Sequence, residues 1–547
     1  MVRKNGFWSL MLLFAVFTFA TGGCGGGGGG DSGGENEPAP AGLVTSDSPA
    51  VSLGAVESDN PLFASFADRL TSKAPDSPLA EAAVIILSSG AVIDEAAGSA
   101  DLGKQIRDAY GRGGIIVVLE PVLADLNKLS ALTGAHLSAA EDNGGERFCD
   151  IYAFVDSETT GFHTYVLGDR EGRYDDVAGP AGGVSAAGPR VGAESAEETE
   201  EIKPDTPGAP PALSEEEYKA ILDHFVEWIN NKGPKNMAAR LQNMKAAARK
   251  ADTANDVLAL VKAQTVTFNN SMTAPWSLDG FQPTALYTDT YFIYAVYDKD
   301  HSYDYYIFDQ ECDLASGNMY KGLWTNSDWG SNTHLMAYYL YDYYTDHYLQ
   351  NSGGAFLSNT QHNIIQPSPT TTTGSTSYTT SQQYTIGGSL GFNGMSGTGS
   401  VSGSMSYSQS HTTSIPDITV KEQCEQPVTS KTGAYNNARW TYAVGNLPHP
   451  KNEYTIFYPH KSTITPEPPA IATTTATLYN TWIWRVSNPS GTYKVLCRSR
   501  PRYAYCEGRA SYPDWTYIDN GTLDDESTLN NGWTQERSIT LIAPPRS

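Results

Sequence analysis

The chain has 547 residues and a formal net charge of −25, with 61 acidic and 36 basic side chains. A balance this acidic excludes nucleic acid as a natural partner, because phosphates require a basic surface. It also argues against polybasic binding to anionic lipid. The length predicts more than one domain, and the 32 tyrosines favour β-sheet and amphipathic contact surfaces.

Residues 1–24 predict an export signal. Arg3 and Lys4 precede the apolar run Phe7–Ala20, which is too short to span a bilayer and suits a signal h-region. The following Thr21-Gly22-Gly23-Cys24 resembles a bacterial lipobox with Cys24 as the lipidated residue, although Thr replaces the usual Leu. We expect an exported lipoprotein of the bacterial outer membrane or cell surface, or a secreted or released protein acting at a target-cell membrane. Residues 25–60 are predicted to be a Gly/Ser/Pro-rich tether.

The next part of the chain alternates apolar strand signals with helical ones, which predicts a small α/β domain over residues 61–169. Its expected strands are 83–87, 114–119, 151–155 and 163–167, and its expected helices are 101–110 and 122–132. An acidic Gly/Pro-rich linker is predicted over 170–213. A helical segment over 214–263 then opens with the capping box Ser214–Glu217. We interpret the α/β domain and linker as a removable or regulatory segment.

From residue 264 onward, short aromatic strands alternate with turn residues, which predicts a β-sandwich over 264–547. The expected strands are 291–297, 305–309, 336–344, 454–458, 473–486, 493–497 and 538–542. The predicted fold class is therefore mainly β: a β-sandwich with an amphipathic stem hairpin, preceded by a small α/β N-terminal domain and a helical segment.

The stem hairpin is predicted at residues 372–412, where the chain is two-faced and uncharged. No Asp, Glu, Lys or Arg occurs between Asn363 and Pro416. Apolar and polar residues alternate along two arms, Tyr384–Phe392 and Gly399–Tyr407, and Asn393-Gly394 opens the turn between them. Each arm has a length suited to a transmembrane strand, which needs about 9–11 residues.

The two faces of the hairpin predict two environments. The residues expected to face lipid are Tyr384, Ile386, Leu390, Phe392, Val401, Met405 and Tyr407. The residues expected to line water are Thr385, Ser389, Ser400, Ser402, Ser404 and Ser406. A single hairpin leaves backbone groups unpaired in hydrocarbon, so several chains must close a barrel together. The sequence therefore indicates an oligomeric pore.

The same residues resemble a known family. The segments Ser377-Tyr378, Gln383–Phe392, Gly399-Ser400 and Ser406–Ser410 resemble the stem of the leukocidin/hemolysin β-barrel pore-forming toxins. Downstream, Arg439–Val444 is similar to the strand by which that family re-enters its β-sandwich. The resemblance implies a non-enzymatic protein that binds a target membrane, assembles into a homo-oligomeric ring and inserts one hairpin from each protomer.

Aromatic and basic residues are candidates for the first membrane contact. Trp324 and Trp329 lie among turn residues, where exposed tryptophan suits a lipid interface or a glycan, and Arg485 suits a phosphate such as that of phosphocholine. The alternative for both tryptophans is packing. For the pair Trp482 and Trp484, which share one face of a strand, core packing is the favoured interpretation.

Two further features of the sequence bear on covalent chemistry: the cysteines and one short motif. Cys497 and Cys506 have a spacing suited to a local disulfide in an oxidising compartment. Gly387–Gly391 matches the hydrolase pattern G-x-S-x-G, but it lies in an alternating strand without the strand–turn–helix that the chemistry needs. No catalytic residue, metal site or cofactor is predicted.

Two rival functions remain open on the sequence. One is a surface-displayed lipoprotein that binds glycans or protein partners without forming pores, with residues 363–416 as a flexible polar arm. The lipobox supports it, since a lytic ring tethered to its own cell needs a release step. The other is a secreted hydrolase whose active site the motifs do not reveal.

Overall fold

The computed structural model describes the backbone in a set of separate ranges. They are residues 50–53, 63, 66, 82–88, 90–137, 148–157, 160–168, 173–174, 215–235, 237, 239–240, 261–273, 284–298, 302–315, 320–325, 333–358, 361–375, 378–386, 392–393, 405–413, 415, 418–424, 428–430, 433–435, 437–444, 470–473, 475–487, 492–511, 514–522 and 534–546. The predicted signal peptide and Cys24 therefore lie outside the described residues.

The first part of the chain forms an α/β lobe, which we define as β1–β5 with helices α2–α4. Strands β1 (Ala50–Leu53), β2 (Val84–Leu87) and β3 (Ile115–Leu119) run parallel, and β4 (Ile151–Ser157) and β5 (Gly161–Leu167) continue the sheet antiparallel. The four strands predicted within residues 83–167 are confirmed, whereas the strand predicted at 454–458 lies outside the described residues. Parallel strands are buried on both faces, which explains the continuous apolar runs of β2 and β3.

Four helices cover the two faces of the lobe sheet. Helices α2 (Gly90–Gly98), α3 (Ala100–Gly111) and α4 (Leu123–Thr133) pack on one face. Helix α5 (Glu215–Asn231) packs on the other, where Phe225 and Trp228 contact Tyr165 of β5. The sequence predicted α3, α4 and α5 but missed α2. It also placed β1 in the tether, which is wrong for these four residues because they pair with β2.

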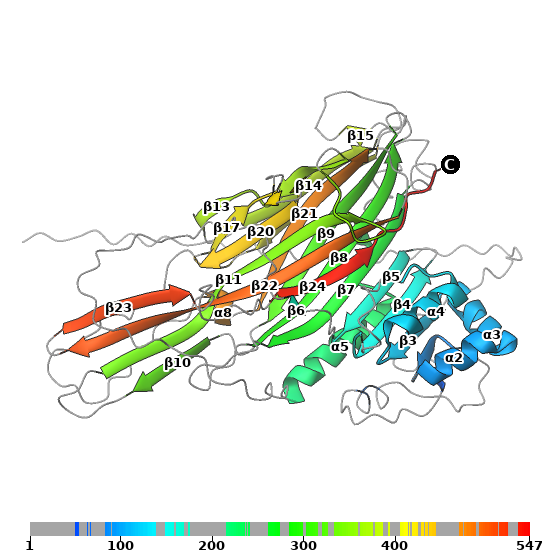
Figure 1. The fold of residues 1–547 in the computed structure, drawn as a ribbon, viewed down its shortest axis with the longest axis horizontal. Coiled ribbons are helices and arrows are strands. Elements are labelled where there is room, and N and C mark those ends of the chain that lie inside the picture. Colours follow the sequence, from blue (N-terminus) through cyan, green and yellow to red (C-terminus); the bar gives the residue numbers. More distant parts are fainter. Residues whose placement is uncertain are drawn as a thin grey trace, which may run out of the picture. The chain divides into compact units, whose positions relative to one another are not determined.

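The lobe sheet continues without a break into the β-rich part of the chain (Figure 1). Strand β5 pairs in parallel with β7 (Val261–Thr273), and β8 (Thr284–Asp298), β9 (Tyr303–Ala315), β21 (Ala476–Ser487) and β12 (His362–Ser368) follow, giving a 10-stranded sheet. The predicted helical segment 214–263 is wrong at its end, where β7 begins at Val261. Because backbone hydrogen bonds join the lobe to β7, the interpretation of the lobe as a removable segment is not supported by this sheet.

A second sheet of nine strands faces the first. Its order is β13 (Thr372–Ser375), β17 (Ile418–Glu422), β20 (Asn437–Val444), β11 (Thr333–Asn351), β22 (Tyr493–Ser511), β24 (Thr534–Thr540) and β6 (Arg173–Tyr174), with β10 (Tyr320–Thr325) beside β11 and β23 (Asp514–Thr522) beside β22. Strand β6 lies within the predicted linker. A short hairpin, β18 (Val428–Ser430) with β19 (Gly433–Tyr435), and helix α8 (Ala470–Thr473) complete the described elements outside the stem.

The two sheets bury an aromatic core between them, which confirms the predicted mainly β fold. Trp482 and Trp484 of β21 are fully buried, and both contact the ring of Phe308 and each other. Trp440 of the second sheet approaches Trp482 with ring centroids 5.5 Å apart. The packing interpretation of Trp482 and Trp484 is therefore confirmed. Side chains alternate along a strand, so the even-numbered positions of β21 face this core and the odd-numbered ones face away.

Candidate functional site

The predicted stem forms its own small sheet. Strand β14 (Tyr378–Ile386) pairs antiparallel with β16 (Met405–Thr413), and the register sets Tyr384 opposite Tyr407 and Ile386 opposite Met405. Directly opposed residues of an antiparallel pair lie on the same face of the sheet. The even positions of the first arm and the odd positions of the second therefore share a face, as the alternation of the sequence predicts.

The first arm of the stem is shorter than predicted. Phe392 and Asn393 form β15, which pairs antiparallel with Ile386 and Thr385 on the free side of β14. Because β15 is antiparallel to β14, the predicted arm Tyr384–Phe392 is not a single unbroken strand in this structure. A fully extended two-faced hairpin exposes its apolar face to water. The antiparallel pairing of β15 with β14 shortens the extended part of the hairpin.

Several predicted stem residues fall outside the described backbone. They are Ser389, Leu390, Ser400, Val401, Ser402 and Ser404. Thr385, Ser406 and the paired apolar positions are described by their backbone only. Their lipid-facing and water-facing roles stay predictions.

The C-terminal end of the stem is docked on the outer face of β21. The imidazole of His411 stacks on the ring of Tyr479, with centroids 4.1 Å apart and planes 9° from parallel. Two residues on, the hydroxyl of Thr413 donates a hydrogen bond of 2.9 Å to the carbonyl of Thr477. Partial burial lowers the pKa of His411. The lower pKa favours the neutral form of the stacked ring.

An acidic row lies beside this dock on β9. Asp309, Glu311 and Asp313 alternate along the outer face, and Glu311 is the cross-strand neighbour of Tyr479. Burial raises the pKa of Glu311 to about 7, against the opposing effect of Arg240. Arg240 donates to both Asp309 and Glu311. Sequence inspection missed this cluster, although the period of two in the acidic residues signals a shared face.

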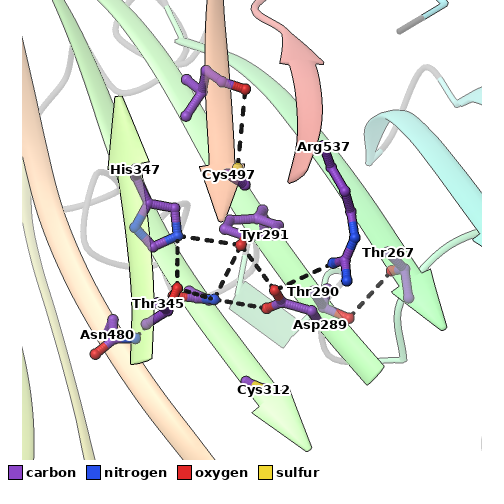
Figure 2. Close-up of polar contacts among 12 residues, drawn as sticks. Thr267, Asp289, Thr290, Tyr291, Cys312, Thr345, His347, Asn480, Cys497 and Arg537 are labelled. Carbon is purple, nitrogen blue, oxygen red and sulfur yellow. Dashed lines mark hydrogen bonds and ion pairs between the residues drawn. The ribbon is translucent and has the colours of Figure 1, made fainter. Parts of the chain in front are cut away.

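A second polar cluster lies between the two sheets (Figure 2). The hydroxyl of Tyr291 donates to a carboxylate oxygen of Asp289 at 2.8 Å, and Gln310 donates to the other at 2.8 Å. His347 of the facing sheet lies 3.2 Å from the Tyr291 hydroxyl and 3.0 Å from the carbonyl oxygen of Ala438. Burial raises the pKa of Asp289 to about 7 and lowers that of His347 to about 4.

This polar layer resembles an acid–base relay in composition, yet its position makes it structural. Asp289, Tyr291, Gln310 and His347 are each fully buried. A reactant has to separate the sheets to reach them. Networks of satisfied polar groups fix one packing arrangement of a core, so we assign the layer to the alignment of the two sheets.

The predicted membrane contacts have mixed outcomes. Trp329 lies outside the described residues, and Trp324 is in β10, where only the backbone is described. Arg485 is half-buried on β21: its Nε donates to Asn363 at 3.0 Å, and its guanidinium lies 5.0 Å from the ring centroid of Tyr303. These contacts hold Arg485 against its own sheet. A role for the three residues in lipid or glycan binding stays a prediction.

The predicted disulfide between Cys497 and Cys506 is wrong. Both residues belong to β22, where Cys497 pairs with His347 and Cys506 pairs with Ala337. Strands rise about 3.3 Å per residue, which separates the two Cα atoms by roughly 30 Å, whereas a disulfide needs about 4.4–6.8 Å. Cys497 is a buried thiol. The spacing of the two cysteines suits a disulfide that closes a loop. The prediction failed because β22 continues as an extended strand from one cysteine to the other.

Basic residues of β22 are used within the fold. Arg498 pairs with Glu536 of β24, and Arg502 pairs with Asp342 of β11.

Among the described residues, no group of three or more His, Cys, Asp or Glu is arranged to hold a metal ion. Within the same residues, no helix has both the length and the apolar character that crossing a bilayer requires.

Comparison with solved structures finds similar proteins over half of the chain. Delta-toxin of Clostridium perfringens is 11% identical, covers 50% of this chain and 93% of its own, and has a TM-score of 0.30. A structure named Pore forming protein is 11% identical, with coverages of 50% and 90% and a TM-score of 0.26. The NetB toxin of Clostridium perfringens in its membrane inserted form is 12% identical, with coverages of 50% and 95% and a TM-score of 0.23. No family model and no curated protein matches the sequence.

Proposed function

We propose that this protein is a pore-forming protein that is secreted or exported and acts on a target membrane. The observation that carries the proposal is the stem. It is free of charged residues from Asn363 to Pro416, and its register sets Tyr384 opposite Tyr407 and Ile386 opposite Met405. A hairpin with one apolar face and one hydroxyl-rich face fits a barrel wall between lipid and water.

The folded-back stem supports the same proposal from another direction. A stem that later inserts must first be stored on a water-soluble chain with limited exposure of its apolar face. Here β15 shortens the first arm, and the stem contacts the sandwich through His411 and Thr413. Strands β14 and β16 also lie against β21, and β14 lies against β12. The proposal requires these contacts to be exchanged for contacts in a bilayer.

In the proposed mechanism, monomers bind a membrane lipid such as one with a phosphocholine headgroup, or a surface glycan, and then assemble into a ring. Each protomer releases its stem, and residues 387–404 extend the two arms. Backbone groups that are unpaired in a single hairpin are satisfied by the neighbouring protomers, because open edges are too costly in hydrocarbon. The mechanism uses no catalytic step and no cofactor.

The test uses two variants that introduce the same charge on opposite faces of the stem. The full-length protein is mixed with dye-loaded vesicles of phosphatidylcholine and cholesterol, and leakage and detergent-resistant oligomers are measured together. Leu390→Asp places a carboxylate toward lipid, where a charged side chain is unfavourable, by about 2–4 kcal/mol for Arg or Lys at the midplane and by less for Asp. The change is present in every protomer of the ring and should abolish leakage. Ser389→Asp places the carboxylate toward water and should retain leakage.

The outcomes separate the proposed function from its rival. Leakage by the parent and by Ser389→Asp but not by Leu390→Asp supports a stem that inserts in the predicted phase. Equal leakage by the two variants contradicts it. A folded parent that never releases dye, on vesicles or on natural membranes, favours a surface lipoprotein that binds glycans or proteins without forming pores.

A further inference from the structure

A row of polar side chains crosses the outer face of the ten-stranded sheet between the lobe and the stem. At the lobe end, the hydroxyl of Tyr165 lies 2.8 Å from Nδ1 of His224 on α5. Across the neighbouring strands β7, β8, β9 and β21, the row in register consists of Thr267, Thr290, Glu311 and Tyr479. The imidazole of His411 stacks on the last of these rings. The lobe and the stem therefore share one continuous surface.

Arg240 enters this surface from the short segment that follows α5. Met237 of that segment is buried among apolar residues of β8, β9 and β21, which anchors it to the sheet. The Arg240 guanidinium donates to Asp309 and to Glu311 and lies 3.8 Å above the ring centroid of Phe292. Its side chain is only 6% exposed.

The two carboxylates that Arg240 binds are the ones next to the stem dock. Asp309 is fully buried and Glu311 is largely buried, so neither is well hydrated. Removing one partner of a buried ion pair leaves an uncompensated charge, which is far more costly than losing a surface pair. Water or a rearranged strand must then reach Glu311, and its cross-strand neighbour is Tyr479, on which His411 stacks.

We infer that Arg240 is a clasp through which the α/β lobe holds the folded stem on β21. The lobe positions α5, α5 leads into the segment of Met237 and Arg240, and Arg240 neutralises the carboxylates beside Tyr479. A displacement of α5 withdraws the guanidinium and weakens the dock of His411. The inference rests on the proposed function, because control over release of the stem matters only to a protein that inserts the stem into a membrane.

The test measures the opening of the stem without any membrane. Thr413 is 7% exposed in the docked stem, so a Thr413→Cys thiol in the full-length protein reacts with a small maleimide mainly when the stem undocks. The native thiol of Cys312, in the core face of β9 and 1% exposed, reports opening of the sandwich in the same molecule. Mass spectrometry of the two peptides gives both labelling rates.

Arg240→Ala should raise the labelling rate of the Thr413→Cys thiol about tenfold or more and leave that of Cys312 unchanged. Arg240→Lys keeps a charge but not the two-pronged fork, so its rate should be intermediate, and it serves as the test if Arg240→Ala fails to fold. The matched control is Lys235→Ala in the same segment. The ion pair of Lys235 with Glu227 is 2.8 Å long and exposed, and its loss should change neither rate.

Two results overturn the clasp. One is an unchanged Thr413→Cys labelling rate in both Arg240 variants. The other is a parallel rise at Cys312, which assigns Arg240 to the stability of the whole sandwich. Vesicle leakage measured beside the labelling separates the two hypotheses: faster labelling with no leakage from any variant upholds the clasp as a contact and contradicts the pore. Leakage by the parent with unchanged labelling upholds the pore and contradicts the clasp.

Discussion

The two faces of β21 can be compared residue by residue. On the inner face, Trp482 stacks on Phe308 with ring centroids 4.8 Å apart and planes 11° from parallel, and Trp484 meets the same ring edge-on at 5.0 Å. On the outer face, the ring of Tyr479 stacks on the imidazole of His411, which belongs to the stem. The inner contacts are surrounded by core, whereas the outer ones are half-buried.

The difference teaches how the two faces of one strand can carry contacts of unequal strength. An aromatic pair contributes about 0.5–1.5 kcal/mol beyond its buried area, and a hydrogen bond contributes about 1 kcal/mol net. The two contacts of His411 and Thr413 therefore contribute a small part of the stability of a domain, which is about 5–15 kcal/mol. If the stem leaves, as the proposed function requires, the strand beneath it can stay folded, because alternate side chains belong to separate environments.

The largest effect is expected from breaking the inner face. Trp482→Ala removes a fully buried ring and leaves a cavity between the sheets, so the free energy of unfolding should fall by about 3–5 kcal/mol. Chemical denaturation followed by far-ultraviolet circular dichroism measures it. A loss below about 1 kcal/mol would show that the inner face is no more essential than the outer one.

His347 in the polar layer is expected to lower the stability of the sandwich in acid, against the opposite contribution of Asp289, whose raised pKa favours the folded state as the pH falls. Burial lowers the pKa of His347 from 6.5 to about 4, so the folded state favours the neutral ring. This contribution is complete above pH 6.5 and is lost as the pH falls toward 4, by about 3 kcal/mol in all. In His347→Gln, stability at pH 7 should be lower, but it should fall less steeply from pH 6.5 to 4. An unchanged slope in denaturation curves across this range contradicts the assignment.

An intermediate effect is expected where the lobe meets the sandwich. Gly161 opens β5 at φ +96°, and a Cβ atom there meets the carbonyl oxygen of Ala263 at 2.4 Å. Gly161→Ala should therefore cost about 1–3 kcal/mol, measured as the change in free energy of unfolding. Gly111→Ala is the control, because a Cβ atom at that helical position meets nothing within 4 Å. If the two changes lowered the free energy of unfolding equally, the close approach of β5 and β7 at Gly161 would not be a special source of stability.

The smallest effect on stability is expected on the outer face of β21. Tyr479→Ala should lower the free energy of unfolding by about 1 kcal/mol yet raise maleimide labelling of a Thr413→Cys thiol, because the stack with His411 is lost. Thr475 is exposed and directly precedes β21, so Thr475→Ala is the control. If Tyr479→Ala destabilised the protein as strongly as Trp482→Ala, the stem would be part of the core and not a separable element.

Much of the fold was predictable because its signals are local. The apolar runs of β2 and β3 and the capping box before α5 were recognised from neighbouring residues alone. The phase of the stem was also local, since a period of two fixes which residues share a face. Helix α2 was missed: its segment Gly90–Gly98 is rich in alanine and glycine and lacks a strong amphipathic pattern.

The candidate site was only half predictable. The stem was found from its alternation and lack of charge, but its dock was not, because Tyr479 and His411 are far apart in the chain and neither belongs to a motif. The same holds for Arg240, which binds Asp309 across a long sequence separation. Arg485 shows the opposite error: its charge suggested a ligand, and the fold gives it Asn363 and Tyr303 as neighbours.

By itself, the sequence determined the two-faced stem, the apolar lobe strands and the mainly β character of the second half, because each depends on the period of side chains along one strand or helix. Only the tertiary structure decided that β5 joins β7, that Cys497 is a buried thiol far from Cys506, and that Arg240 lies beside the stem dock. Those outcomes depend on which distant strands become neighbours. Burial and strand pairing across the sheets decide which strands become neighbours, and no short stretch of sequence predicts this.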